Sequence, residues 1–146
     1  MNQIRPLAIC VFRRGDKILV FEGFDPAKGQ QFYRPLGGGI EFGETGAQAV
    51  RRELREEIQA EVAVVRFLGA LENIFTFNGQ PGHEIVLVYD GRLADETLYT
   101  QSEIHGQEDE GLTFSVMWKS LDEFGPGAPL YPDGLAEMLQ QNEDRP

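Results

Sequence analysis

The sequence contains a single cysteine, Cys10, in 146 residues, so no disulfide can form within the chain. Because Cys10 stands in an apolar run, its position favours a small buried thiol over a nucleophile. No apolar run approaches the ~20 residues needed to span a bilayer. The first residues also lack the basic-then-apolar layout of a signal peptide. Together these absences predict a protein of the reducing cytoplasm.

Positive charge is scarce as well. The chain has 13 lysines and arginines against 24 aspartates and glutamates, which gives a net charge of −11. An acidic surface repels DNA, RNA and anionic membranes, so we expect neither a nucleic acid polymer nor a membrane as a partner. If the substrate is itself a polyanion, a few arginines or divalent cations must lie between it and the protein.

No repeat, low-complexity tract or linker divides the sequence, so we expect one domain over residues 1–146. Apolar β-rich segments predict strands at residues 7–13, 17–22, 32–36, 62–77, 83–93 and 112–118. Loops or turns are predicted at 24–31, 78–82 and 94–111, and helices at 45–59 and 134–141. This order indicates an α/β or α+β fold, with a mixed sheet covered on both faces.

The segment 45–59 is the clearest helix. Thr45 and Gln48 match the capping-box pattern, which places the helix start at Thr45. At about 100° per residue, one narrow stripe contains Ala47, Val50, Leu54 and Ile58 and should face the core. Beside that stripe, on one arc, lie the three acidic residues Glu53, Glu56 and Glu57. A solvated acidic face balanced by arginines is one interpretation of this cluster, and a cation site is the other.

The segment before the helix favours the cation site. Residues 36–44 form a glycine-rich loop in which the backbone can approach a ligand closely, although a plain turn would also explain the glycines. Glu44 ends this loop eight residues before Arg52, and an ion pair between them would hold the glutamates in a fixed pose. Several oxygen ligands in one place suit a hard cation such as Mg²⁺ or Mn²⁺.

The spacing from Gly38 through Glu44 to Arg52, Glu53, Glu56 and Glu57 resembles the signature of the Nudix hydrolases of the MutT type. The resemblance implies an α+β fold, the Nudix-type α/β/α sandwich with a mixed β-sheet. It implies a Mg²⁺- or Mn²⁺-dependent hydrolase that cleaves the diphosphate linkage of a nucleoside di- or triphosphate derivative by water attack on phosphorus. The implied substrate is a small nucleotide-like diphosphate, and the family often forms homodimers.

The resemblance also assigns roles to residues. Glu53, Glu56 and Glu57 are the implied metal-binding carboxylates, and the carbonyl of Gly37 is a further ligand. The implied catalytic residues are Glu53, Arg52 and Glu44, the last two as an orienting pair. The general base is either Glu53 or a member of the acidic trio Glu108, Asp109 and Glu110, for which a solvated loop is the competing interpretation.

The chain departs from the family pattern at the end of the helix. The pattern continues with a glycine and an aliphatic residue, where this sequence has Gln59 and Ala60. A left-handed conformation at Gln59 would cost about 1–2 kcal/mol, so we expect the helix to end differently.

Residues outside the motif give weaker indications. His83 and Glu84 are interpreted as surface residues at a strand start. Phe75 and Phe77, with Tyr33, could stack on a base, but one face of a strand is the favoured interpretation for the two phenylalanines. Arg34 or Lys28 could reach a phosphate, and no residue decides between a nucleoside triphosphate, a sugar nucleotide and a dinucleoside polyphosphate.

Three other functions are compatible with parts of the sequence. A non-catalytic nucleotide-sensing module of the same fold would typically lack a motif carboxylate, and all of them are present here. An isoprenoid diphosphate isomerase would need a cysteine in the pocket, which Cys10 in an early strand does not supply. A small acidic interaction domain with a coincidental helix is disfavoured by the number of matched motif positions.

Overall fold

The computed structural model describes residues 2–108 and 111–143. Its strands are β1 (Ile4–Arg14), β2 (Lys17–Asp25), β3 (Gln30–Arg34), β4 (Leu36–Gly39), β5 (Val62–Phe77), β6 (Gln80–Leu93), β7 (Glu103–Gln107) and β8 (Thr113–Ser120). The α-helices are α1 (Gly46–Ile58) and α2 (Leu135–Glu143), and two short 3₁₀ helices are η1 (Glu96–Tyr99) and η2 (Leu121–Glu123). None of the helices in the described ranges combines the length and apolar character needed to cross a membrane.

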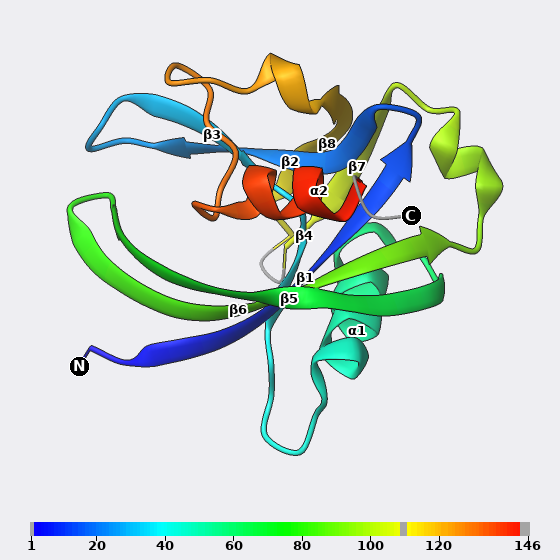
Figure 1. Ribbon diagram of the computed structural model, residues 1–146, viewed down its shortest axis with the longest axis horizontal. Coiled ribbons are helices and arrows are strands. Elements are labelled where there is room, and N and C mark those ends of the chain that lie inside the picture. The colour runs from blue at the N-terminus through cyan, green and yellow to red at the C-terminus, as the bar shows by residue number, and fades with distance from the viewer. Residues whose placement is uncertain (1, 109–110, 144–146) are drawn as a thin grey trace.

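The sheet is mixed and consists of two halves that meet near one turn. In the first half, β1 pairs in parallel with β6 and antiparallel with β4, and β5 pairs antiparallel with β6. In the second half, β2 lies between β3 and β8, and β7 pairs with β8. The halves join where β1 and β2 pair at Arg13–Ile18 and Arg14–Lys17, beside the turn at residues 15 and 16. Away from this turn, β1 pairs with β4 and β2 pairs with β3, so the two halves separate (Figure 1).

Two hydrophobic clusters pack against opposite faces of the sheet, because side chains alternate along each strand. On β1, Ala8 and Cys10 belong to the cluster that α1 completes, whereas Leu7 and Ile9 belong to the cluster that α2 completes. The two helices therefore cover opposite sides of the sheet, which makes the fold the expected α+β sandwich (Figure 1).

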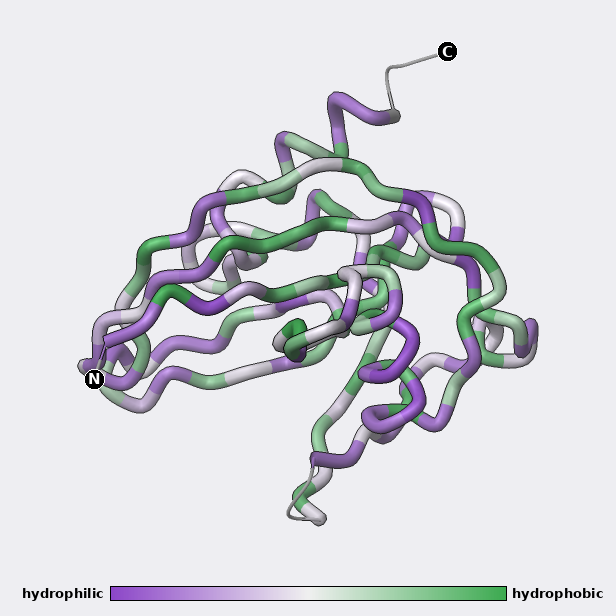
Figure 2. The backbone as a smooth tube through the Cα atoms, turned by 90° about the horizontal axis from the view of Figure 1, so that it is seen from below, coloured by the Kyte–Doolittle hydropathy of each residue, from purple (hydrophilic) through white to green (hydrophobic). Residues whose placement is uncertain are grey.

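Helix α1 is anchored by a narrow apolar face. Val50 and Leu54 are fully buried, and full burial stabilises each by about 1.5–3 kcal/mol. Ala47 and Ile58, from the predicted stripe, are half-buried against the same cluster. Most of the remaining helix is polar, and Figure 2 shows α1 as largely hydrophilic beside strands with long hydrophobic segments. The charged face of α1 is thus not needed to anchor the helix to the core.

The structure corrects several of the expected boundaries. The predicted loop at 24–31 is confined to residues 26–29, because β2 and β3 extend into it. The segment 94–111 contains β7, and the glycines at 37–39 lie in the strand β4. The turn between β5 and β6 involves only Asn78 and Gly79, whose φ angles of 49° and 76° are those of a two-residue hairpin turn.

Candidate active site

The start of α1 is held by the predicted capping box. The amide of Gln48 donates to Thr45 Oγ1 at 3.1 Å, and the amide of Thr45 donates to Gln48 Oε1 at 2.8 Å. These bonds satisfy two backbone groups that would otherwise lack partners at a helix start. The cap fixes the direction in which the helix leaves the glycine segment.

Arg52 joins the helix to that segment. Its Nε donates to Glu44 Oε2 at 2.8 Å and its Nη2 to Glu44 Oε1 at 2.9 Å, which is the bidentate geometry of a strong arginine–carboxylate pair. Nη2 also donates to the carbonyl of Gly39 at 2.8 Å. The hydrogen bonds from Arg52, followed by that from the Glu41 amide, lower the pKa of Glu44 to about 2. The structure therefore contains the ion pair that the spacing suggested.

The glycines of β4 let this strand lie against neighbours that leave no room for side chains. A Cβ at Gly37 would overlap the carbonyl oxygen of Ala8, and the φ of 148° at Gly37 also favours glycine. A Cβ at Gly38 would lie 2.5 Å from the carboxyl carbon of Glu53. The carboxylate of Glu53 thus lies directly over the backbone of Gly38.

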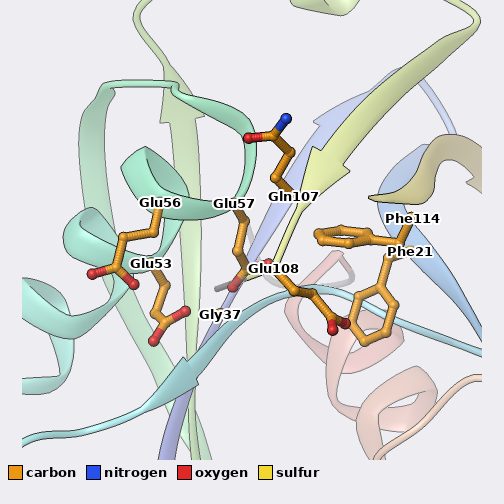
Figure 3. Close-up of a pocket in the computed structure, with 8 residues that line it drawn as sticks. All are labelled: Phe21, Gly37, Glu53, Glu56, Glu57, Gln107, Glu108 and Phe114. Atoms are coloured by element: carbon orange, nitrogen blue, oxygen red, sulfur yellow. The ribbon is translucent and has the colours of Figure 1, made fainter. Parts of the chain in front are cut away.

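A cavity of about 430 Å³ opens at this place. Its lining residues come from the strands β2, β4, β7 and β8, from α1 and from the residue after β7, and are Phe21, Gly37, Glu53, Glu56, Glu57, Gln107, Glu108 and Phe114 (Figure 3). The predicted metal-binding residues therefore share one cavity. Asp109 and Glu110, the other two members of the predicted acidic trio, lie outside the described residues.

The glutamates of this cavity strongly influence one another. Burial raises the pKa of Glu57 to about 9, with further contributions from its hydrogen bond to Glu53 and from the charge of Glu53. A hydrogen bond from the backbone of Gly37 acts in the opposite direction. Two acidic groups are thus held together at a place where both cannot easily be ionised, and a cation would remove that conflict.

Arg52 forms hydrogen bonds with two of the three glutamates on the acidic face of α1. Its Nη1 donates to Glu53 Oε1 at 2.8 Å and to Glu56 Oε2 at 3.4 Å. Within residues 2–108 and 111–143, no three acidic, histidine or cysteine side chains converge closely enough to hold an ion as they stand. The donor set nevertheless fits a hard cation, because Glu53 and Glu57 already meet and Glu56, whose side chain is 48% exposed, lines the same cavity.

The structure adds residues that the sequence did not indicate. Phe21, Gln107 and Phe114 line the cavity, and the last two arrive through the β7–β8 pair. Strand β7 lies in the segment predicted to be irregular, so its residues carried no signal. Cys10 is fully buried, and burial raises the pKa of its thiol well above the ordinary value, which confirms the structural interpretation of this cysteine.

Comparison with known proteins identifies the family. The family model described as the NUDIX domain matches residues 2–141, nearly the whole chain. The chain belongs to the Nudix family. This confirms the resemblance drawn from the motif between Gly38 and Glu57 and places the chain among the Nudix hydrolases.

Curated relatives of this Nudix chain include two bacterial enzymes. It is 32% identical over 124 residues to the NAD-capped RNA hydrolase NudC of Pseudomonas aeruginosa (strain LESB58), with 85% of this chain and 39% of the relative covered. It is 34% identical over 129 residues to the NAD-capped RNA hydrolase NudC of Haemophilus influenzae (strain PittGG), with 86% and 43% covered. The chain thus spans about two fifths of the length of these relatives.

Solved structures share the Nudix fold. A MutT NUDIX hydrolase from Burkholderia pseudomallei superposes with a TM-score of 0.65 at 22% identity, over 96% of this chain and 98% of that one. The E. coli ORF135 protein superposes with a TM-score of 0.60 at 21% identity, over 98% and 93%. At this level of identity the likeness concerns the fold alone.

Proposed function

We propose that the protein is a Mg²⁺- or Mn²⁺-dependent hydrolase that cleaves the diphosphate linkage of a nucleoside di- or triphosphate derivative by water attack on phosphorus. The observation that carries this proposal is the contact of Glu53 and Glu57 over the glycine strand β4, in a cavity whose acidic groups are poised for a cation. Family membership supports the reaction class.

In this proposal the chain's own groups prepare the site. Glu53, Glu56, Glu57 and the carbonyl of Gly37 would hold the ion. A divalent ion, when bound, supplies charge stabilisation to the phosphate oxygens. Arg52, fixed by Glu44, would keep the acidic face of α1 in register with β4. The rigid pair of helix and strand would therefore set the geometry before substrate arrives.

The proton of the attacking water needs an acceptor. Glu53 is one candidate, because Arg52 holds its carboxylate in position above Gly38. Glu108 is the other, because it lines the opposite side of the same cavity at the end of β7 (Figure 3). Loss of activity in Glu108→Gln with normal metal affinity would identify Glu108 as the base.

We also propose a small nucleotide rather than a nucleic acid polymer as the substrate. The net charge of −11 opposes long polyanions, although the relatives named above are hydrolases of NAD-capped RNA. The same acidity makes bound cations the natural means of holding a diphosphate. A cytoplasmic location is consistent with the single buried thiol.

The test replaces Glu53 and Glu57 separately with glutamine. We expect Mg²⁺-dependent release of products from a panel of nucleoside triphosphates, sugar nucleotides and dinucleotides to fall by on the order of 10²–10⁴-fold in each variant. Folding should survive, because glutamine has the shape of glutamate and removes a charge from a crowded site. Circular dichroism and thermal unfolding check the fold.

Glu61→Gln is the matched control, because Glu61 is an exposed glutamate beyond the helix and pairs with Arg55, outside the cavity. Its activity should equal that of the unmodified protein. Full activity in both Glu53→Gln and Glu57→Gln would refute the proposed site. Binding of nucleotides by the unmodified protein without release of any product would instead indicate a sensing module.

A further inference from the structure

A second cavity lies between the two hairpins that project from the sheet halves. It has a volume of about 470 Å³, within the ~300–1,000 Å³ typical of small-molecule sites. Most of its lining residues belong to the β2–β3 and β5–β6 hairpins, which project toward the same side of the molecule in Figure 1. Phe21 lines both this cavity and the one with the glutamates, so the two are neighbours. A substrate with its diphosphate at the glutamates could place its remaining part here.

A buried polar cluster forms part of this cavity and contradicts the expectation that Glu84 is a surface residue. Glu84 is 4% exposed and Asn73, its partner across β5 and β6, is 5% exposed. Asn73 Nδ2 donates to Glu84 Oε1 at 3.2 Å, and Arg34 Nη2 donates to the same oxygen at 3.4 Å. A charged group is buried in a protein only when partners compensate it, and here Asn73 and Arg34 are the partners of Glu84.

One oxygen of Glu84 is left for a ligand. Both hydrogen bonds fall on Oε1, and no donor in the described part of the chain bonds to Oε2. No fully buried polar side-chain atom of the described residues lacks a partner, so Oε2 keeps some accessible surface, and the cavity is the space that Glu84 lines. Arg34 donates to Glu84 through one of its five N–H groups and lines the same cavity. The cavity thus offers an acceptor beside a donor.

Aromatic side chains from both hairpins line the cavity. Phe32 lies over Gly23 across β2 and β3, and Phe75 lies over Gly82 across β5 and β6. In each pair a Cβ on the glycine would overlap the distal end of the phenyl ring, so the ring packs against the backbone of the neighbouring strand. Phe77 meets Phe32 edge-on, with ring centroids 6.0 Å apart. Flat phenyl faces favour stacking with a planar ring.

Tyr33 has no part in this surface, in contrast to the sequence-based suggestion. It is 8% exposed and belongs to the cluster under α2, where it packs against Phe124. The neighbouring residues Phe32 and Arg34 point to the other face of β3, as alternation along a strand requires.

We propose that this cavity recognises a planar heterocycle that carries an amide edge, an N–H beside a carbonyl. The N–H would donate to Glu84 Oε2, and the carbonyl would accept from Arg34, while the ring stacks on Phe32 and Phe75. A carboxylate only accepts and a guanidinium only donates, so the complementary ligand must present both groups side by side. A lactam base such as hypoxanthine or guanine has this edge, and so has a pyridine carboxamide. Adenine presents an acceptor nitrogen at that edge, which Glu84 would repel.

This proposal rests on the proposed function, since it names the substrate class of the same site. Its test compares substrates that differ only at the amide edge. Inosine triphosphate and ATP have the same ribose and triphosphate. The base of inosine triphosphate has a lactam edge, whereas that of ATP has an amidine edge. NAD carries a carboxamide where nicotinic acid adenine dinucleotide carries a carboxylate. This pair therefore tests whether the ligand is a pyridine carboxamide. We expect kcat/KM to favour inosine triphosphate, NAD or both over the matched partner by about 10–100-fold. Ratios within about twofold for both pairs would overturn the proposal.

Glu84→Gln gives the sharper result. The new amide can either donate or accept, so the preference for inosine triphosphate should shrink to within a few fold, mainly because activity towards ATP rises. A variant that merely loosened the fold would lower both activities together. If Glu84→Gln does not fold, Arg34→Met replaces it, and its activity towards inosine triphosphate should fall several-fold more than its activity towards ATP, so that the preference shrinks. Glu72→Gln is the control, because Glu72 is an exposed glutamate next to Asn73 that does not line the cavity.

A binding experiment separates failure of this proposal from failure of the proposed function. Inosine monophosphate and AMP are titrated calorimetrically without a divalent ion, so that no hydrolysis is needed. Tighter binding of inosine monophosphate supports the cavity's role even if no triphosphate is cleaved. Nicotinamide mononucleotide and nicotinic acid mononucleotide are titrated in the same way, and equal affinity within both pairs, or no binding of any of the four, overturns the proposal even if hydrolysis is observed.

Discussion

Gly38 affects the position of the Glu53 carboxylate although it has no side chain of its own. The carboxylate of Glu53 occupies the space above its Cα, and Arg52 holds the carboxylate there. The φ of Gly38 is negative, so backbone strain does not require a glycine at this place. The requirement for glycine is therefore the space that Glu53 fills, and this can be tested separately from folding.

Gly38→Ala should lower activity by on the order of 10–100-fold while the unfolding temperature changes little, because the methyl group displaces a flexible carboxylate rather than backbone. Steady-state kinetics and thermal unfolding measure the two effects. Gly39→Ala is the control: a Cβ there would meet only Arg5 Nη2, at 3.6 Å. Equal activities of the two variants would show that the position of Glu53 does not depend on Gly38.

Helix α1 ends in a way that the sequence argued against. Gln59 adopts the left-handed conformation, with φ 56° and ψ 36°, although it is not glycine. Its amide donates to the carbonyl of Arg55 at 3.0 Å, and the amide of Ala60 donates to Leu54 at 3.2 Å. These bonds satisfy carbonyls at the helix end, and burial of Ala60 directs the chain into the core. The tertiary structure thus overrides the local preference of one residue.

Gln59→Gly should therefore stabilise the protein. The left-handed conformation costs a residue with a Cβ about 1–2 kcal/mol, and the greater freedom of glycine in the unfolded chain offsets about 0.4–1 kcal/mol of the gain. We expect a net increase of about 1 kcal/mol or less in the free energy of unfolding, measured by urea titration. Gln59→Val should shift the midpoint in the opposite direction, since a branched side chain tolerates this conformation poorly. A lower midpoint for Gln59→Gly would contradict the argument.

Elements with local signals could be predicted from the sequence, and elements that depend on distant partners could not. The capping pair Thr45 and Gln48 predicted the start of α1, and the apolar run from Val62 predicted all of β5. Strand β4 was missed because its glycines have no strand preference and form a strand only by pairing with β1. The burial of Glu84 was missed for a related reason, since Arg34 reaches it from another hairpin.

The motif glutamates illustrate the same division within the candidate site. Their common helix face follows from spacing alone, and the structure places them in one cavity. The contribution of Gln107 depends on β7, and that of Phe21 on the separation of the two sheet halves. Neither is encoded near the motif. Sequence therefore predicted the residues proposed to handle the diphosphate better than those that surround them.

At the scale of the whole molecule, the net charge of −11 acts on stability in two ways that can be separated. General repulsion among acidic side chains weakens the compact state, and any salt screens it. The cost of ionising Glu53 and Glu57 together is local and poorly screened, and an ion that binds in their cavity removes it best. Monovalent and divalent salts should therefore have different effects on the unfolding temperature.

Raising NaCl from about 10 to 150 mM, a range in which the Debye length falls from ~30 to ~8 Å, should increase the unfolding temperature of the protein and of Glu57→Gln alike. MgCl₂ at matched ionic strength should give a further increase in the unmodified protein, because binding to the folded state alone stabilises it. Glu57→Gln should lose that further increase, since it lacks one of the proposed ligands, whereas Glu61→Gln should retain it. If MgCl₂ and NaCl acted identically on the unmodified protein, the acidic cavity would be only part of the general charge, and the proposed cation site would be wrong.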